Sequence, residues 1–310
     1  MGEKMQKVLA IVGPTAIGKT SLAIQLAQKV KAEIISGDSM QVYKEVAIGT
    51  AKATPTEQKT IRHYLVDTQS VFEPYSVIDF IDQAEKAIEQ IAAKGKLPLL
   101  VGGTGFYVNA LLNKMKLGEP TRQESVITDK WEKFLQEQGK NKLWAELAKR
   151  DPDAAQKIPL NNTRRVLRAL TVIERTGKKF SQQQKTIEAR YDYLIIGLNS
   201  DRSIIYRRIN KRVDQMMEQG LLEEAKFIYQ NRAQEYTILQ AIGYKEFFPY
   251  FAKQNNLENC VSNLKTASRR YAKRQLTYFR HQLPVTWFDP LKDPNCLNKI
   301  TQKVEEWLNE

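Results

Sequence analysis

Eight residues near the start of the chain have the types and the spacing of a phosphate-binding loop. They are Gly13, Pro14, Thr15, Ala16, Ile17, Gly18, Lys19 and Thr20, and they match G-x-x-x-x-G-K-[ST] at every fixed position. Glycines let a backbone curl until its N–H groups converge on an anion, and a following helix adds the positive end of its dipole. Lys19 supplies a charge for terminal phosphate oxygens, and the Thr20 hydroxyl suits a Mg²⁺ ligand. A glycine-rich turn with a chance lysine is the alternative, and the motif does not identify the phosphate compound.

Asp38 is a candidate partner of this loop in a reaction. It follows a short apolar strand, so we expect it at the same rim of a parallel sheet as the phosphate-binding loop. Three interpretations are open: a general base for an N–H or O–H nucleophile, a partner of Mg²⁺, or the side chain of an Asx turn. Arg212 lies on a predicted helix and either reaches a leaving phosphate or faces solvent.

The segment Gly102-Gly103-Thr104 ends another apolar strand without an acidic residue. P-loop ATPases usually hold Mg²⁺ with an aspartate at such a strand end, so its absence argues against ATP hydrolysis. Thr104 instead offers a hydroxyl that suits a hydrogen bond to a phosphate oxygen. The alternative for this segment is a tight turn.

Strands that alternate with helices are expected to position these residues. Apolar runs predict strands at 8–12, 32–36, 97–101 and 193–198. A helix with a continuous apolar stripe is predicted to begin after Ser76, a plausible N-cap. The pattern predicts an α/β fold: a P-loop NTPase-like core with a central parallel sheet.

The charge balance favours a polyanionic partner. The 310 residues include 48 Lys and Arg against 35 Asp and Glu, a formal net charge of +13. Nucleic acid is the first expectation, and an acidic membrane surface or a merely basic protein is the alternative. Cys260 and Cys296 have no metal-ligand spacing and form no disulfide framework, which indicates a reducing compartment. Without a signal peptide or a membrane-length apolar run, we expect a cytoplasmic protein with no membrane and no obligate protein partner.

The α/β rhythm stops near residue 115. Residues 116–190 are predicted to be helical, polar and basic, and 157–190 hold nine Lys or Arg against two Glu. We therefore predict an all-helical insertion at 116–190. The core would then consist of residues 1–115 and 191–310.

A second basic region is the helix predicted at about 259–282. It carries six Lys or Arg and no acidic residue, and Lys265, Arg269, Lys273 and Arg280 share one face. Such a face is either an ordinary solvated surface or a site for a phosphate backbone. The missing counter-charge favours the phosphate backbone, with nearby aromatics available for stacking.

Together these stretches resemble one family, the bacterial tRNA dimethylallyltransferases, also called tRNA isopentenyltransferases. The similar stretches follow the family's order and span nearly the whole chain. They are GPTAIGKTSLA (13–23), ISGDSMQVYKEVAIGTAK (35–52), YSVIDF (75–80), LLVGGTGFYVNAL (99–111), RRVLRAL (164–170), RINKRVDQMMEQGL (208–221), IGYKEF (242–247) and YAKRQLTYFRHQ (271–282). The resemblance implies a P-loop core with a helical insertion that helps to grip the tRNA anticodon stem-loop.

The resemblance also implies a reaction. Dimethylallyl diphosphate would give its five-carbon group to N6 of the adenosine immediately 3′ of the anticodon, position 37, and diphosphate would leave. By position, Asp38 is similar to the family's base, and Thr104 to the residue at the bridging oxygen of the breaking C–O bond. Lys19 and Arg212 are similar to the cations that neutralise the diphosphate, and Thr20 to the hydroxyl on the Mg²⁺ side.

Several segments resemble the family's tRNA-contacting positions. They contain Asp38, Ser39, Met40, Gln41, Arg164, Arg165, Arg168, Gly243, Tyr244, Lys245, Lys273, Arg274 and Arg280. Residues 118–128 match the family poorly, so no contact is assigned there. Three other functions are weighed: an enzyme that prenylates free adenine nucleotides, a P-loop small-molecule kinase and a non-catalytic RNA-binding protein.

Overall fold

The computed structural model of the chain describes residues 5–115, 122–182, 188–232 and 237–310. Contacts divide the chain into two compact units, one formed by residues 1–115 with 188–310 and the other by residues 116–187. Each unit has a hydrophobic core of its own. The catalytic and RNA-binding roles expected of the two parts stay predictions. No helix among the described residues is both long and apolar enough to cross a membrane.

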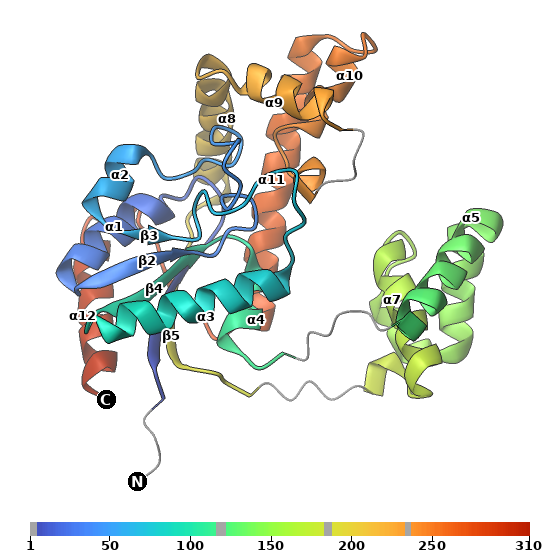
Figure 1. Ribbon diagram of the computed structural model, residues 1–310, viewed down its shortest axis with the longest axis horizontal. Helices are drawn as coiled ribbons and strands as arrows, with labels where there is room; N and C mark the ends of the chain where they lie inside the picture. Colours follow the sequence, from blue (N-terminus) through green and yellow to red (C-terminus); the bar gives the residue numbers. More distant parts are fainter. Residues whose placement is uncertain (1–4, 116–121, 183–187, 233–236) are drawn as a thin grey trace. The chain divides into compact units, whose positions relative to one another are not determined.

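A parallel sheet forms the centre of the first unit. Its strands are β1 (Lys7–Val12), β2 (Ala32–Ser36), β3 (His63–Tyr64), β4 (Leu97–Gly102), β5 (Asp192–Leu198) and β6 (Thr286–Phe288). The six strands are ordered β3-β2-β4-β1-β5-β6, and every pair is parallel (Figure 1). Side chains of β1 and β2 are buried on both faces, which requires helices on both sides of the sheet. The predicted α/β core with a central parallel sheet is confirmed.

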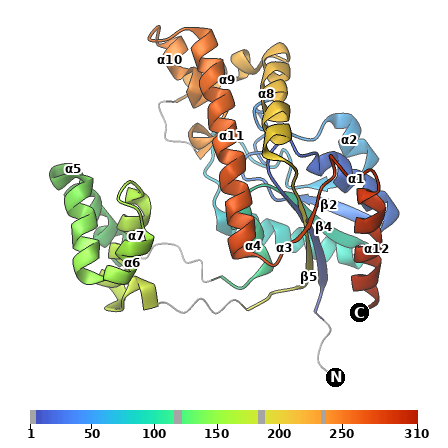
Figure 2. The same cartoon turned by 180° about the vertical axis from the view of Figure 1, so that it is seen from behind.

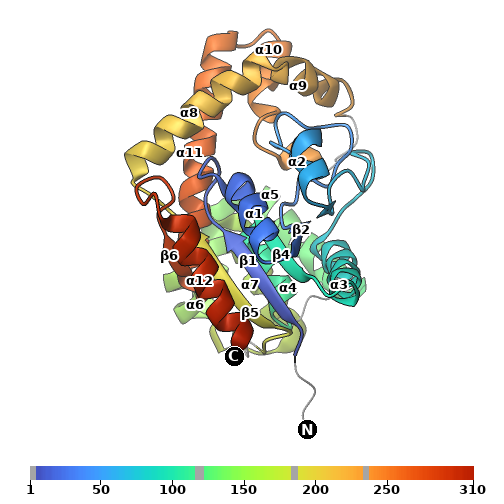
Figure 3. The same ribbon diagram turned by 90° about the vertical axis from the view of Figure 1, so that its left-hand side faces the viewer.

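Helices surround this sheet. They are α1 (Lys19–Lys29), α2 (Pro55–Thr60), α3 (Val77–Ala93), α4 (Gly105–Leu112), α8 (Arg202–Glu218), α9 (Leu221–Gln230), α10 (Phe248–Phe251), α11 (Leu257–Gln282) and α12 (Cys296–Asn309), with short 3₁₀ turns η2 (Thr237–Gln240) and η3 (Lys245–Phe247). Helices α1 and α12 pack together over one face, and α3 and α4 over the other (Figure 3). Helix α11 packs against both α8 and α4 (Figure 2).

Local sequence signals explain where several helices begin. Ser76 caps α3 as predicted, and with Asp79 it forms a reciprocal capping box. The loop expected between residues 44 and 75 also contains α2, which Thr54 and Glu57 cap in the same way. Helix α11 begins two residues earlier than predicted, so it includes the acidic residue Glu258.

The register of the sheet brings the functional loops to one edge. Val12 pairs with Gly102, and Ser36 with Val101, so β1, β2 and β4 end at nearly the same level. A further backbone bond from Gly37 N–H to the Val101 carbonyl, 2.8 Å long, continues this alignment beyond β2. The segments that follow these three strands therefore leave the sheet at its carboxyl edge, where ligands of such sheets bind.

The second unit is built from helices alone in its described part. They are α5 (Arg122–Arg150), α6 (Pro152–Lys157), α7 (Thr163–Thr176) and the 3₁₀ turn η1 (Phe180–Gln182). Trp131, Leu143 and Leu147 from α5 pack with Leu170 of α7 in its core. Part of the poorly matching segment 118–128, residues 118–121, lies outside the described residues.

Candidate active site

The phosphate-binding loop connects β1 to α1. Gly13 has φ 153°, and a Cβ there would lie 2.6 Å from the Leu198 carbonyl oxygen, so the first position of the motif has no room for a side chain. Helix α1 begins at Lys19, directly after Gly18 in a left-handed conformation. The Lys19 ammonium donates to the carbonyl oxygens of Gly13 and Pro14, at 3.0 and 2.9 Å. The lysine therefore folds over its own loop.

Three charged side chains from different elements act on one another beside this loop. They are Lys19 at the start of α1, Asp38 after β2, and Arg212 of α8. Burial lowers the pKa of Lys19 to about 8, while the Asp38 charge opposes this shift. Burial also raises the pKa of Asp38 and lowers that of Arg212, each against the attraction of the other. Charges that remain incompletely compensated at a strand edge are typical of a functional site.

Asp38 lies in a tight turn after β2. Its Oδ1 accepts a hydrogen bond of 3.0 Å from the Met40 backbone N–H, which is the Asx turn considered from the sequence. This bond fixes the carboxylate without neutralising it, so the turn and a catalytic role are compatible.

Thr104 joins the same group through hydroxyl contacts. It precedes α4, and its Oγ1 accepts a hydrogen bond of 3.2 Å from the Ser39 N–H, with the Ser39 hydroxyl 3.4 Å away. Tyr271 of α11 also interacts with Thr104. Burial and the nearby Asp38 charge raise the pKa of Tyr271 to about 12, so this phenol stays protonated. The loops after β2 and β4 therefore meet at hydroxyl groups.

Sequence reasoning missed the residue that links two of these loops. The buried Gln275 of α11 accepts a hydrogen bond of 2.9 Å from the Thr15 N–H and donates one of 3.0 Å to the Gly103 carbonyl. The available signal was a polar side chain one helical turn after Tyr271 and one before the buried Phe279, on the apolar side of a basic helix.

Arg208 of α8 was also missed. Its Nε donates to the Ala16 carbonyl at 2.8 Å, so this arginine of α8 binds the backbone of the phosphate-binding loop. It lies one helical turn before Arg212, and this spacing was the signal in the sequence.

The residues expected to contact RNA differ in exposure. Arg164, Arg165 and Arg168 are exposed on α7, and Lys273, Arg274 and Arg280 are exposed on α11; Lys245 is exposed as well, and Ser39 and Met40 are partly exposed. Tyr244 is fully buried, where its hydroxyl donates to Glu224 at 2.9 Å, and the neighbouring Gly243 is also buried. The Tyr244 side chain therefore serves the core, and a contact of this segment with RNA stays a prediction.

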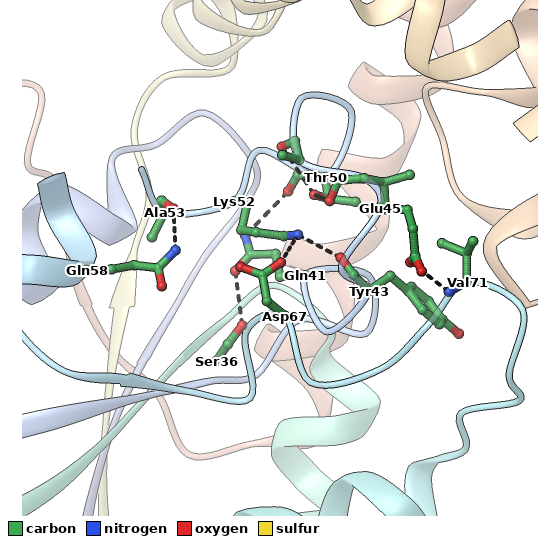
Figure 4. Close-up of polar contacts among 12 residues, drawn as sticks. Ser36, Gln41, Tyr43, Glu45, Thr50, Lys52, Ala53, Gln58, Asp67 and Val71 are labelled. Carbon is green, nitrogen blue, oxygen red and sulfur yellow. Dashed lines mark hydrogen bonds and ion pairs between the residues drawn. The ribbon is translucent and has the colours of Figure 1, made fainter. Parts of the chain in front are cut away.

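Gln41 is held by its own loop, as Figure 4 shows. Its Oε1 accepts from the Ser36 hydroxyl at 3.0 Å, and its Nε2 donates to the carbonyls of Thr50 and Ala51 at 3.3 and 3.2 Å. The side chain thus ties the turn after β2 to residues 50–51. A contact from Gln41 to RNA stays a prediction.

Two of the basic residues predicted to share a face of α11 have partners on α8. Lys265 forms an ion pair of 2.5 Å with Asp214, and Arg269 donates to Asn210 at 2.7 Å. The interpretation that this stripe lacks counter-charge is therefore wrong at Lys265. The exposed cations of this helix are Arg270 and those from Lys273 onward.

A metal ion at this site would take most of its ligands from the substrate and from water. Among the described residues, no three His, Cys, Asp or Glu side chains gather as a metal-binding group. Thr20 offers a hydroxyl in the first turn of α1, next to Lys19. Mg²⁺ commonly binds through one or two protein oxygens, substrate phosphates and water, so this donor set fits it.

The sheet and the loop at its carboxyl edge place the chain among P-loop proteins. The chain belongs to the IPP transferase family, and the model of that family matches residues 41–282.

Full-length relatives extend this match across the phosphate-binding loop. The chain is 68% identical over 306 residues to a tRNA dimethylallyltransferase of Lactobacillus helveticus, covering 99% of this chain and 100% of the relative. It is 69% identical over 305 residues to the Lactobacillus acidophilus protein of the same name, covering 98% and 100%.

Solved structures agree with this assignment. A tRNA isopentenylpyrophosphate transferase from Bacillus halodurans is 43% identical with a TM-score of 0.75, and the match covers 98% of this chain and 97% of that one. A eukaryotic dimethylallyltransferase acting on tRNA is 34% identical, also with a TM-score of 0.75, covering 96% and 77%.

Proposed function

We propose that this protein transfers the dimethylallyl group from dimethylallyl diphosphate to N6 of the adenosine 3′ of the anticodon in tRNA. The names of its close relatives support a tRNA dimethylallyltransferase. Within the structure, the observation that carries the proposal is the meeting of Lys19, Asp38 and Arg212 beside a phosphate-binding loop. It combines cations for a leaving diphosphate with a carboxylate for a nucleophile.

In this mechanism the C1–O bond of the allylic diphosphate breaks, and its electron pair leaves with the diphosphate. Lys19 and Arg212 stabilise the charge that develops there, and the Thr104 hydroxyl donates to the bridging oxygen. Among the described residues, the hydrogen bonds of Lys19 go to the neutral carbonyl oxygens of Gly13 and Pro14, so its ammonium can turn to the diphosphate.

N6 of the adenine forms the new C–N bond and loses a proton. Asp38 accepts this proton, because an exocyclic amine is a poor nucleophile until its lone pair is freed. The raised pKa of Asp38 makes its ionised carboxylate a stronger base. The target base must leave the stacked anticodon loop to reach the carboxylate, as in other enzymes that modify bases.

Mg²⁺ is the proposed cofactor. Thr20 would hold it together with diphosphate oxygens, where the ion neutralises charge on the leaving group. Removal of divalent ions with EDTA should abolish turnover, and Mg²⁺ should restore it.

The exposed cations of α7 and α11 are proposed to bind the phosphate backbone of the anticodon stem-loop. With a substrate of this kind, we infer that the protein works in the cytoplasm. Neutralised phosphates make the affinity depend on salt, which is a separate test of this part of the proposal.

The decisive experiment is mass analysis of nucleosides from unmodified tRNA after incubation with the protein, Mg²⁺ and dimethylallyl diphosphate. N6-dimethylallyladenosine at position 37 is the expected product. Competition with AMP separates the alternatives: prenylated AMP in preference to tRNA would indicate an enzyme for free nucleotides. Phosphoryl transfer from ATP, without prenylation, would indicate a kinase.

A further inference from the structure

Gln275 of α11 touches two loops that belong to different strands. Its Oε1 accepts from Thr15 in the loop after β1, and its Nε2 donates to Gly103 in the loop after β4. The side chain is only 5% exposed, and both bonds have ordinary lengths of 2.9 and 3.0 Å. A buried amide that satisfies two backbone groups at once fixes the distance between them.

We infer that Gln275 is a positioning residue for prenyl transfer, because it sets the phosphate-binding loop against the Thr104 loop. This inference rests on the proposed function, in which one loop holds the diphosphate and Thr104 meets its bridging oxygen. The reacting C–O bond must lie between these two loops. A displacement of about 1 Å between such groups lowers turnover by about 10²-fold.

Space around Gly103 shows how closely the amide fits. A Cβ on Gly103 would lie 2.2 Å from Gln275 Nε2 and 3.4 Å from Gln275 Cδ, with the Gly13 carbonyl oxygen at 3.7 Å. Only the end of the glutamine thus occupies the space beside this glycine. Its φ is outside the left-handed range, so an alanine there would be opposed by the Gln275 amide and not by the backbone.

The role of Gln275 is separable from RNA binding on the same helix. Lys273 and Arg274 are exposed, whereas Gln275 points into the protein and Tyr271, one turn earlier, interacts with both Thr104 and Gln275. Loss of the amide should therefore change the chemical step and leave the affinity for tRNA as it was.

The first test is Gln275→Leu, which keeps most of the volume and removes the hydrogen bonds to Thr15 and Gly103 as well as the interaction with Tyr271. Single-turnover rates with saturating tRNA and dimethylallyl diphosphate should fall about 10–10²-fold, with the Kd for tRNA and its salt dependence unchanged. Tyr278→Phe is the matched control: it removes the bond of 3.1 Å between Tyr278 and Asn109, which joins α11 to α4, and it keeps the ring that packs beside Gly105. That variant should keep the wild-type rate.

A second variant protects the test against misfolding of the first. Gly103→Ala should push the Gln275 amide aside and produce the same loss of rate with the same Kd for tRNA. Adding Gln275→Ala to Gly103→Ala should cause no further loss, because the contact is already broken. Rate losses that multiply in the double variant would overturn the inference, as would an unchanged rate in folded Gln275→Leu. An inactive wild-type protein would instead contradict the proposed function.

Discussion

Two carboxylates at opposite ends of β2 behave in opposite ways. Glu33, near the start of the strand, is 5% exposed and accepts hydrogen bonds from Lys96, Lys94 and Tyr64 at 2.8 to 2.9 Å. Burial would raise its pKa, but these donors outweigh that effect and lower it to about 2. Asp38 lies just beyond the other end of the strand, and its pKa is raised because burial outweighs its partners.

The difference separates structure from function within one strand. The charge of Glu33 is fully paired within the protein, since each of its carboxylate oxygens forms an ion pair with a lysine. At Asp38 the cations that act on the carboxylate are Lys19 and Arg212, and Lys19 donates its hydrogen bonds to loop carbonyls. A charged group without an oppositely charged hydrogen-bonding partner in the chain is available to a ligand. A charged group that is paired within the chain stabilises the fold.

The largest effect is expected from a change at Asp38, the carboxylate that is not fully paired within the chain. Asp38→Asn keeps an oxygen that can accept from Met40, so the turn should survive. Turnover should fall by about 10²–10⁴-fold because the base is lost, while the Kd for tRNA stays the same. Single-turnover assays and filter binding measure the two quantities. Full activity in this variant would show that Asp38 is not the base.

The pH profile tests the same carboxylate without a mutation. Asp38 works as a base only when ionised, and burial raises its pKa above the ordinary value. The single-turnover rate should therefore fall as the solution is acidified, beginning above the ordinary carboxyl range near pH 4. A rate that stays constant down to pH 4 would contradict an Asp38 base.

The next prediction concerns Lys19, the cation proposed to bind the diphosphate. Its pKa is lowered to about 8, and only the protonated form attracts a diphosphate. Affinity for dimethylallyl diphosphate should therefore decline above pH 8, by up to about tenfold per pH unit. At pH 8.5, calorimetry in buffers of different ionisation enthalpy should show proton uptake on binding. Lys19→Gln should bind more weakly and lose this uptake; equal uptake in both proteins would assign the proton elsewhere.

A change at Glu33 tests the carboxylate that is fully paired within the chain. Glu33→Gln should lower the free energy of unfolding by about 1–3 kcal/mol, since two lysines lose their charged acceptor. Turnover at a temperature where the variant is folded should match the wild type. Denaturant unfolding measures the first quantity and the prenylation assay the second. Because the folded pKa of about 2 is below the unfolded value, this stability is present above pH 4.5. It is lost as the pH falls from 4.5 towards 2.

The smallest effect compares two lysines of α11. Lys273 is exposed, whereas Lys265 is paired with Asp214. Lys273→Ala should weaken tRNA binding and reduce the slope of log K against log salt by about 1. Lys265→Ala is the matched variant and should leave that slope close to the wild-type value. Equal slopes in all three proteins would place Lys273 away from the RNA.

Much of the fold was predictable because its signals are local. Apolar runs located β1, β2, β4 and β5 within about a residue, and Ser76 located the start of α3. The weakest elements, α2 and β3, were missed within a segment expected to be a loop. Their short length leaves little periodicity to detect.

The site was predictable only in part. Motif spacing marked Lys19 and the strand order marked Asp38, because both follow from the chain's own sequence of elements. The burial of Tyr244 and the ion pair of Lys265 depend on α9 and α8, which pack against them from elsewhere in the chain. Exposure of a polar side chain is a property of such packing and has no local signal.

The sequence by itself determined the phosphate-binding loop, the parallel α/β core and the excess of positive charge. Their causes are short-range: glycine conformations, apolar periodicity and residue counts. Only the tertiary structure decided which charged side chains are paired within the chain and which are available to a ligand. It set Gln275 between Thr15 and Gly103, residues 260 and 172 positions away along the chain. Hydrogen bonds and desolvation act over a few ångströms, so their partners become known only when the chain has folded.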